Sequence, residues 1–428
     1  MADAKGLIEY IEKGPSPFHC VVETVRRLEA AGFTEWEPTN ALPELSPGAG
    51  GYLRRGGTVI AWRVGTHAPA EAGFRLLGAH TDSPNLRLKP NADLTTEGYA
   101  QWAIEPYGGV LLATWTDRDL GLSGRVIVRD GMKRVPRLIR IDKPLARVAN
   151  LAIHLNRNVN DKGLILNKQS HMPPIVGQVD TDGSHSLREF LSEHLDCLFE
   201  DIIGWDLGLH DTQAPALGGL NNEFVFSPRL DNQASCYMAL SALLALDATT
   251  RHTSVVTLYD HEEVGSGSDT GAESTLTRNV LDMLVDAHPV RVSGGITRAL
   301  ANSFLVSADM AHGVHPNYVD KSEKNHKPHM NAGPVIKTNV NMRYATDAET
   351  SARFRMACAD EGIPVQEFVN RSDLACGSTI GAISAAALAV RTVDVGNAML
   401  SMHSIREQCG AHDVEMMTRA MIRILKEG

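Results

Sequence analysis

The sequence predicts an α/β protein in which a mainly parallel, mixed sheet is flanked by helices and interrupted by a β-rich insertion. From Phe224 onward, short apolar runs of strand length alternate with longer helical patterns, and such alternation builds parallel strands covered by helices on both faces. Between about Asn91 and Asn222, strand-like runs and polar connections rich in glycine and proline replace this pattern. The chain has 428 residues, more than the roughly 250–300 that one core normally holds, so we expect two domains.

The amino-terminal part and the insertion supply the first elements. Helical spacing predicts a helix over Val21–Ala31. Strands are predicted over Thr58–Val64, Phe74–Ala79, Gly109–Thr116 and Arg125–Arg129. The dipeptide Asp130-Gly131 favours a tight hairpin turn, because glycine tolerates positive φ.

The carboxyl-terminal part alternates between strands and helices. Strands are predicted over Val255–Leu258, Phe304–Ser307 and Ala398–Met402. The segments Ala234–Leu246 and Ile380–Val390 are apolar nearly all round, as buried helices are. Thr346 and Glu349 have capping-box spacing for a helix that runs to about Glu361. A last amphipathic helix is marked by Val414, Met417, Met421 and Ile424.

Composition and charge exclude several classes of partner. The formal net charge is −10, with 41 basic and 51 acidic residues and no block of Lys and Arg, so nucleic acid and anionic membranes are poor partners. No apolar stretch reaches the roughly 18 residues of a membrane span, and the first 14 residues carry charges instead of an apolar signal core. The six cysteines are scattered without a CxxC pair, which favours reduced thiols and a cytoplasmic location.

Candidate metal ligands follow the ends of several apolar runs. Phe74–Ala79 leads to His80 and Asp82, and similar runs lead to the other candidates: Glu262 and Glu263, Asp309 and His403. Asp231 precedes the helix that begins near Ala234. Because ligands of open α/β sheets lie beyond the carboxyl ends of the strands, these side chains are expected to converge.

Each candidate also has an ordinary structural explanation. His80 could be a hydrogen-bonded histidine at a strand end, Asp231 a helix N-cap, and Asp309 a turn residue; His403 could be a loop histidine. The joint pattern favours metal, since two His, two Asp and one Glu suit zinc. Five ligands are too many for one tetrahedral ion with an open position, but they suit two ions that share a bridging carboxylate.

Five long motifs carry a resemblance to a known family. They are Gly78–Pro84, Ser227–Asn232, Asp260–Ser266, Ser307–His312 and Ser401–Glu407. In this order they resemble the motifs of the aspartyl aminopeptidase family of dizinc metallopeptidases, and the chain resembles a bacterial member of that family. The resemblance covers essentially the whole chain, from Ser16-Pro17-Phe18-His19 to the carboxyl-terminal helix.

The resemblance implies a role for each candidate ligand. One Zn²⁺ is expected on His80 and Asp309 and a second on Glu263 and His403, with Asp231 bridging them; Co²⁺ and Mn²⁺ are alternative metals. Glu262 would be the general base, and Asp82 would orient the His80 imidazole. A strained peptide is expected at Asp231–Asn232.

The resemblance also implies substrate contacts. Lys337 and Tyr344 match positions that line the substrate pocket, His312 matches a further contact, and His154 matches a histidine contributed by a neighbouring subunit. A preference for amino-terminal Asp or Glu follows if Lys337 faces the substrate carboxylate. The alternative for Lys337 is a solvated surface lysine. For the loop Cys376-Gly377-Ser378-Thr379, the alternative to a substrate contact is a plain strand-to-helix turn.

An assembly follows from the same resemblance. Residues 1–90 and 223–428 would form a discontinuous catalytic domain of the dizinc exopeptidase type, and residues 91–222 an inserted β-rich dimerisation domain. Dimers would build a homododecamer that acts on peptides with free amino termini. Two alternatives remain: a broad or leucine-preferring aminopeptidase (or a deacylase acting on small amides), and a non-catalytic relative that serves assembly or cargo binding.

Overall fold

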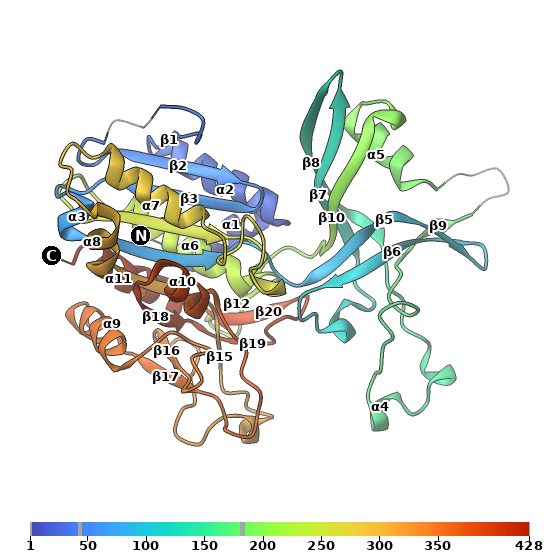
Figure 1. The fold of residues 1–428 in the computed structure, drawn as a ribbon. Coiled ribbons are helices and arrows are strands. Elements are labelled where there is room, and N and C mark those ends of the chain that lie inside the picture. Colours follow the sequence, from blue (N-terminus) through green and yellow to red (C-terminus); the bar gives the residue numbers. More distant parts are fainter. Residues whose placement is uncertain (1, 42–44, 180–184, 428) are drawn as a thin grey trace. The chain divides into compact units, whose positions relative to one another are not determined.

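The computed structural model describes residues 2–41, 45–179 and 185–427, and the chain divides into two compact units (Figure 1). The first unit comprises Met1–Asp82, Pro215–Met402 and Glu407–Gly428. The second comprises Ser83–Ala214 together with His403–Arg406. The short segment at 403–406 therefore belongs with the insertion, although more than 180 residues separate the two in sequence.

A nine-stranded mixed sheet forms the centre of the first unit within the described residues. Its strands, in spatial order, are β1 (Thr34–Glu35), β2 (Gly50–Arg55), β3 (Thr58–Arg63), β13 (Thr253–Tyr259), β4 (Phe74–His80), β14 (Phe304–Ala308), β18 (Arg391–Gly396), β16 (Val335–Thr338) and β17 (Gln366–Val369). The four strands β13, β4, β14 and β18 run parallel to their neighbours in this group. Their carboxyl ends therefore meet at one edge of the sheet, as the predicted class requires.

Alternation along the strands divides the core of the first unit into two layers. Val256 and Val306 face one hydrophobic cluster, whereas Val255 and Leu305 face another, because successive side chains of a strand point to opposite faces. The first cluster contains residues of α1 (Ala4–Lys13), α2 (Pro17–Ala30), α6 (Leu230–Leu244), α9 (Ala348–Asp360) and α11 (Asp413–Leu425). The second contains residues of α7 (Leu276–Ala287), α8 (Gly295–Ala301) and α10 (Ile380–Leu388). Helices thus cover both faces of the sheet (Figure 1), which confirms the predicted fold class.

A smaller sheet in the same unit corrects one expectation. The predicted strand Ala398–Met402 is only β19 (Ala398–Leu400), which pairs with β15 (Ala311–His312) and β20 (Glu407–Gly410) and not with the central sheet. The same small sheet contains β11 (Ala216–Gly218) and β12 (Phe224–Ser227). The strand of the central sheet is β18 just upstream, because a local apolar pattern does not tell which sheet a strand joins.

The second unit is built on an antiparallel sheet. Its strands, in spatial order, are β8 (Lys133–Ala146), β7 (Leu120–Asp130), β10 (Ile202–Asp211), β5 (Asn85–Thr96), β6 (Tyr99–Tyr107) and β9 (Ile175–Gln178). Every pairing in it is antiparallel. The sheet carries its own hydrophobic cluster, which includes Trp102, Leu122, Val126 and Leu207. The insertion is therefore β-rich with a separate core.

Local predictions are partly confirmed. The hairpin of β7 and β8 turns at Gly131, whose φ is +60°, as the Asp130-Gly131 pair predicts. Gly109–Thr116 is wrong as a strand, since it contains the 3-10 helix η1 (Leu112–Trp115). The capping box of α9 joins Asp347 and Thr350, one position later than the predicted pair, because the Asp347 carboxylate is the stronger acceptor for the Thr350 N–H at 2.8 Å.

The remaining elements are short. They are α3 (Pro69–Ala72), η2 (Ile153–Leu155), α4 (Val159–Lys162), α5 (Leu187–Leu195), η3 (Phe199–Asp201), η4 (Glu262–Val264) and η5 (Val319–Lys321). Within the described ranges, no helix has both the length and the apolar character needed to cross a lipid bilayer.

Candidate functional site

The carboxyl-terminal edge of the central sheet brings several predicted ligands together. His80 is the last residue of β4, Glu262 and Glu263 follow β13 in η4, and Asp309 follows β14. Asp231 lies at the start of α6, where its backbone is not helical. The ligand atoms of His80, Asp231 and Glu263 lie within 4.8 Å of one another, close enough for these residues to belong to one metal site.

The orientation of the His80 ring shows that this cluster suits a cation. Nδ1 lies 3.1 Å from the carbonyl oxygen of Asp82 and 3.3 Å from Asp82 Oδ1, and because both are acceptors, Nδ1 carries a hydrogen. Nε2 then faces Asp231 Oδ1 at 3.4 Å, Asp309 Oδ1 at 3.8 Å and Glu262 Oε2 at 3.9 Å. A ring nitrogen that faces three carboxylates requires a proton or a metal ion between them.

Asp82 organises both sides of this arrangement. Its side chain is fully buried, and besides contacting the His80 ring it accepts hydrogen bonds from the backbone N–H groups of Glu262 (3.2 Å) and Glu263 (3.1 Å). One carboxylate therefore positions the imidazole and the turn that carries the two glutamates.

The electrostatics of the cluster also favour bound positive charge. Burial, and then the charges of Asp309, Asp82 and Asp231, raise the pKa of Glu262 to about 8, although His80 opposes the shift. Burial and the neighbouring Asp231 raise the pKa of Glu263 well above its usual range. Burial alone would lower the pKa of His80, but its contacts with Asp231, Asp309 and Asp82 raise it. A multivalent cation would stabilise this group of buried carboxylates. The carboxylate oxygens together with the imidazole nitrogen of His80 form a donor set that fits zinc.

Three residues that support the cluster had no predicted role. The buried Glu407 accepts a hydrogen bond from the Asp231 N–H at 3.1 Å. Asn232, whose peptide bond to Asp231 is cis, donates from Nδ2 to the Ala308 carbonyl at 2.9 Å. Cys236 Sγ donates to the His80 carbonyl at 2.9 Å. Glu407 ends the motif Ser401–Glu407, and its place in that motif is the one sequence signal that could have identified it.

His403 belongs to the second unit, where it contacts Gly109 and Leu111. Its Nδ1 lies 3.0 Å from the carbonyl oxygen of Gly109, and its carbonyl accepts from the Leu111 N–H at 3.1 Å. The first contact requires hydrogen on Nδ1, which selects the tautomer with its lone pair on Nε2. That is the tautomer a metal ligand needs, and the role of His403 stays a prediction.

Lys337 and Tyr344 lie together beside Asp309. Lys337 is only 2% exposed, so the surface-lysine alternative is wrong. Its Nζ donates to the Met310 carbonyl at 3.1 Å, lies 3.5 Å from Asp309 Oδ2 and is 5.3 Å from the centre of the buried Tyr344 ring. His312, in β15, is exposed, and its ring centre lies 5.7 Å from that of Phe368. Phe368 also packs against Tyr344 at 6.4 Å, so an aromatic wall connects His312 to the lysine.

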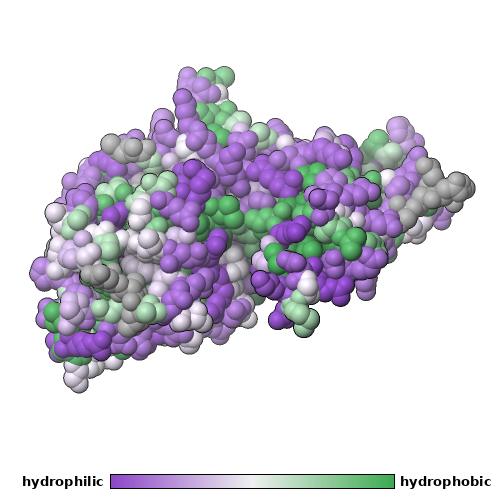
Figure 2. All heavy atoms as spheres, turned by 90° about the horizontal axis from the view of Figure 1, so that it is seen from above, coloured by the Kyte–Doolittle hydropathy of each residue, from purple (hydrophilic) through white to green (hydrophobic). Residues whose placement is uncertain are grey.

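His154 lies on an exposed segment of the second unit. It occupies η2 and has exposed apolar neighbours, since Leu151 is 61% and Leu155 74% exposed. The surface drawn in Figure 2 is mostly hydrophilic, with hydrophobic residues gathered in separate areas. With Ile153 at 46%, three large apolar side chains are exposed within five residues, and such groups of exposed apolar residues are typical of surfaces that contact another chain.

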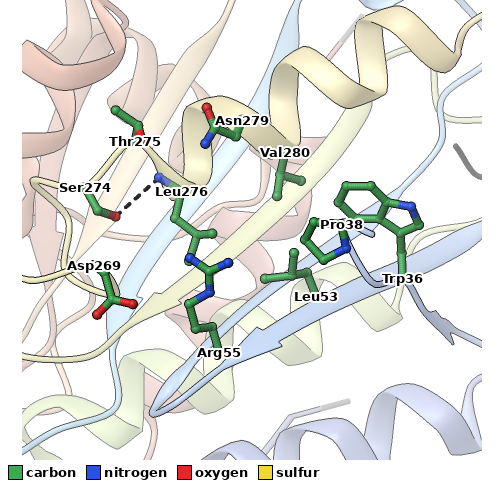
Figure 3. Close-up of a pocket in the computed structure, with 10 residues that line it drawn as sticks. All are labelled: Trp36, Pro38, Leu53, Arg55, Asp269, Ser274, Thr275, Leu276, Asn279 and Val280. Carbon is green, nitrogen blue, oxygen red and sulfur yellow. Dashed lines mark hydrogen bonds between the residues drawn. The ribbon is translucent and has the colours of Figure 1, made fainter. Parts of the chain in front are cut away.

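A separate pocket in the first unit involves none of the predicted site residues (Figure 3). It measures about 190 Å³ and lies against the first turn of α7 and the end of β2. It is lined by Trp36, Pro38, Leu53, Arg55, Asp269, Ser274, Thr275, Leu276, Asn279 and Val280. Its charged residues, Arg55 and Asp269, are exposed, in contrast to the buried charges of the metal-ligand cluster.

Comparison with known proteins supports the resemblance drawn from the motifs. The model of the family described as "Aminopeptidase I zinc metalloprotease (M18)" matches residues 10–423. A protein of Pseudomonas putida strain F1 named "Probable M18 family aminopeptidase 2" is 46% identical over 420 residues, which cover 97% of this chain and 96% of that protein. A protein of the same name from Pseudomonas aeruginosa strain UCBPP-PA14 is 44% identical over 421 residues, with the same coverage of both chains.

Solved structures are similar over the whole chain. A chain of the structure titled "Cryo-EM structure of the Ape4 and Nbr1 complex" superposes with a TM-score of 0.93 at 35% identity, and the match covers 99% of this chain and 85% of the other. A chain of the structure titled as the S. cerevisiae mApe1 dodecamer superposes with a TM-score of 0.85 at 29% identity, and the match covers 99% of this chain and 96% of the other. These matches confirm the fold class and the family resemblance.

Proposed function

Because this chain belongs to the M18 family of zinc metallo-aminopeptidases and is therefore a hydrolase that acts on peptides, we propose that it releases amino-terminal Asp and Glu residues. The proposal assigns two zinc ions to each subunit. His80 and Asp309 would hold one, Glu263 and His403 would hold the other, and Asp231 would be the ligand that both share. The main support for metal-dependent activity is the position of His80, whose Nε2 atom faces three carboxylates at 3.4–3.9 Å.

The metal and Glu262 divide the chemistry between them. Zinc, when bound, polarises the scissile carbonyl and lowers the pKa of a water molecule towards about 7. Glu262 accepts the proton from the attacking water and returns it to the leaving amine. Its Oε2 atom lies 3.9 Å from Nε2 of His80, beside the proposed ligands, and a carboxylate at this position can both take and release a proton.

Asp82 and the acidic character of the site complete the machinery. Asp82 keeps hydrogen on Nδ1 of His80, so that Nε2 presents its lone pair to the ligand side. The free α-amino group of a peptide, when neutral, offers a lone pair that a bound metal ion could accept, whereas an internal peptide bond offers none. This supports exopeptidase action at the amino terminus.

Acidic specificity is proposed from Lys337. Its buried ammonium group lies beside Asp309, and a charge-assisted hydrogen bond to a substrate carboxylate contributes about 1.5–3 kcal/mol. Tyr344 and His312 would shape the same pocket. The related alternative is a broad or leucine-preferring enzyme, in which the lysine serves only to neutralise Asp309.

A homododecamer built from dimers is proposed as the working assembly. One of the similar solved structures is titled as a dodecamer, and the exposed segment around His154 offers an apolar surface for a neighbouring subunit. His154 would then reach the neighbour's substrate. Size-exclusion chromatography with light scattering gives the mass, and a stable monomer would contradict this assembly.

Metal analysis and a substrate panel on one preparation test the proposed function. We expect two zinc ions per chain and the fastest hydrolysis of chromogenic substrates with amino-terminal Asp or Glu. Faster hydrolysis of the leucine substrate would favour the broad enzyme. A pure protein without metal or peptidase activity would favour the non-catalytic alternative.

A further inference from the structure

Asp394 is a fully buried carboxylate in the middle of the central sheet, and it has no part in the proposed mechanism. It lies in β18, whose register pairs it with Ser307 of β14. On the other side, β18 pairs with β16 so that Val335 faces Gly396 and Ile336 faces Val395. The next position in that register puts Lys337 opposite Asp394. Ser307, Asp394 and Lys337 therefore form one row across three adjacent strands.

The carboxylate of Asp394 joins three chain segments through short hydrogen bonds. Oδ1 accepts from Ser307 Oγ at 2.6 Å and from Thr379 Oγ1 at 2.6 Å. Oδ2 accepts from the backbone N–H of Ala345 at 2.6 Å. The backbone of the same residue donates to Thr346 Oγ1 at 2.8 Å. Burying a charge is costly unless it is fully hydrogen-bonded, and here each oxygen has a donor.

Two of the segments it joins are those for which substrate contacts are expected. Ala345 follows Tyr344 directly, and Thr379 ends the loop that starts at Cys376 and caps α10. Gly381 of α10 packs so closely that a Cβ atom there would lie 2.2 Å from both Asp394 carboxylate oxygens. The helix amino terminus therefore rests directly on the carboxylate, an arrangement that favours negative charge.

We propose that Asp394 is a positioning residue for the substrate pocket, holding the Tyr344 segment and the Cys376–Thr379 loop against the sheet row that ends at Lys337. This inference rests on the proposed function, in which Lys337 and Tyr344 contact the substrate side chain. Asp394 itself touches no reacting atom. Its loss should therefore weaken substrate binding and leave the metal ligands in place.

The test compares Asp394→Ala with Asp394→Asn in the full-length, zinc-loaded enzyme. The alanine variant removes all three side-chain hydrogen bonds. The asparagine can keep them, because its amide oxygen can accept from the Ala345 N–H while its amide nitrogen donates to the hydroxyl groups of Ser307 and Thr379, which can also accept. Glu23→Ala is the matched control, since Glu23 is a buried carboxylate of α2 whose hydrogen bonds go to Arg26 and Arg27.

For Asp394→Ala we expect the KM of an amino-terminal glutamate substrate to rise about tenfold, equivalent to about 1.4 kcal/mol, with kcat and zinc content close to wild type. Asp394→Asn should restore the KM, and Glu23→Ala should leave it unchanged. An unchanged KM in the alanine variant, a loss confined to kcat, or an asparagine variant as weak as alanine would overturn the inference.

A second variant keeps the test decisive if Asp394→Ala does not fold. Ser307→Ala removes one donor to Asp394 and leaves the Thr379 cap of α10 in place, and it should raise the same KM by about threefold; an unchanged value would overturn the inference. If the wild-type enzyme prefers leucine, the proposed acidic specificity is wrong. The KM of the leucine substrate in the same variants then decides the role of Asp394.

Discussion

Two buried histidines lie at opposite ends of the same pair of strands, and their surroundings differ in charge. His80, at the carboxyl end of β4, faces three carboxylates, which raise its pKa. His252, just before β13, accepts a hydrogen bond from the Arg75 guanidinium at 3.0 Å, and burial and that charge lower its pKa to about 4. The same residue type is thus prepared to bind a cation at one end and to remain neutral at the other.

The largest expected effect comes from removing His80, at the carboxyl end of β4, which we call the acidic end. His80→Ala deletes the nitrogen that faces Asp231, Asp309 and Glu262, so kcat/KM should fall by more than about 10²-fold together with zinc content. Metal analysis and peptidase assays measure both. The matched control is His252→Gln, which should keep zinc and activity; equal zinc content in the two variants would contradict the assignment of His80.

Glu262→Gln separates proton transfer from metal binding at the acidic end. The amide cannot accept the proton, so kcat should fall by about 10²–10⁴-fold while zinc content stays at the wild-type level. Steady-state kinetics with metal analysis of the same sample measure this difference. A near-wild-type kcat would remove Glu262 from the role of general base.

Lys337→Ala tests whether the ammonium group beside the acidic cluster binds the side-chain carboxylate of the substrate. We expect kcat/KM for amino-terminal Asp and Glu substrates to fall by about 10–100-fold, matching a charge-assisted hydrogen bond of about 1.5–3 kcal/mol, and to fall less for leucine. Lys337→Arg, which keeps the charge, should retain part of the preference. Equal losses on both substrates would show that the lysine only balances Asp309.

The smallest expected effect is on the free energy of unfolding and comes from His252, which lies beside Arg75 at the other end of the strands (the basic end). His252 has a lowered pKa in the folded protein, about 4 against roughly 6.5 when unfolded. Its neutral form therefore stabilises the fold above pH 6.5, and this contribution is lost as the pH falls from 6.5 towards 4. His252→Gln cannot titrate and should lose about 1 kcal/mol less than wild type between pH 7 and pH 5. Denaturant unfolding at both pH values measures this, and parallel losses in the two proteins would contradict it.

The two ends also show why sequence reasoning succeeded at one kind of residue and failed at another. His80, Glu262, Glu263 and Asp309 each follow an apolar run, and parallel strands bring such ends together whatever the details of the loops. Asp394 lies between two valines of β18, and Glu407 lies between Arg406 and Gln408 at the start of β20; neither setting indicates which distant groups the carboxylate contacts. Their hydrogen bonds to Ala345 and Asp231 join segments 49 and 176 residues away.

The order of apolar runs and the five motifs were enough to establish the α/β class, the β-rich insertion and the family, because these depend on local periodicity and residue identity. Neither could assign Ala398–Leu400 to the small sheet or His403 to the second unit. Nor could they reveal that Lys337 is buried. Those properties arise from pairings between distant segments, where the free energy of burying a charge or a strand edge depends on neighbours that no local stretch of sequence contains.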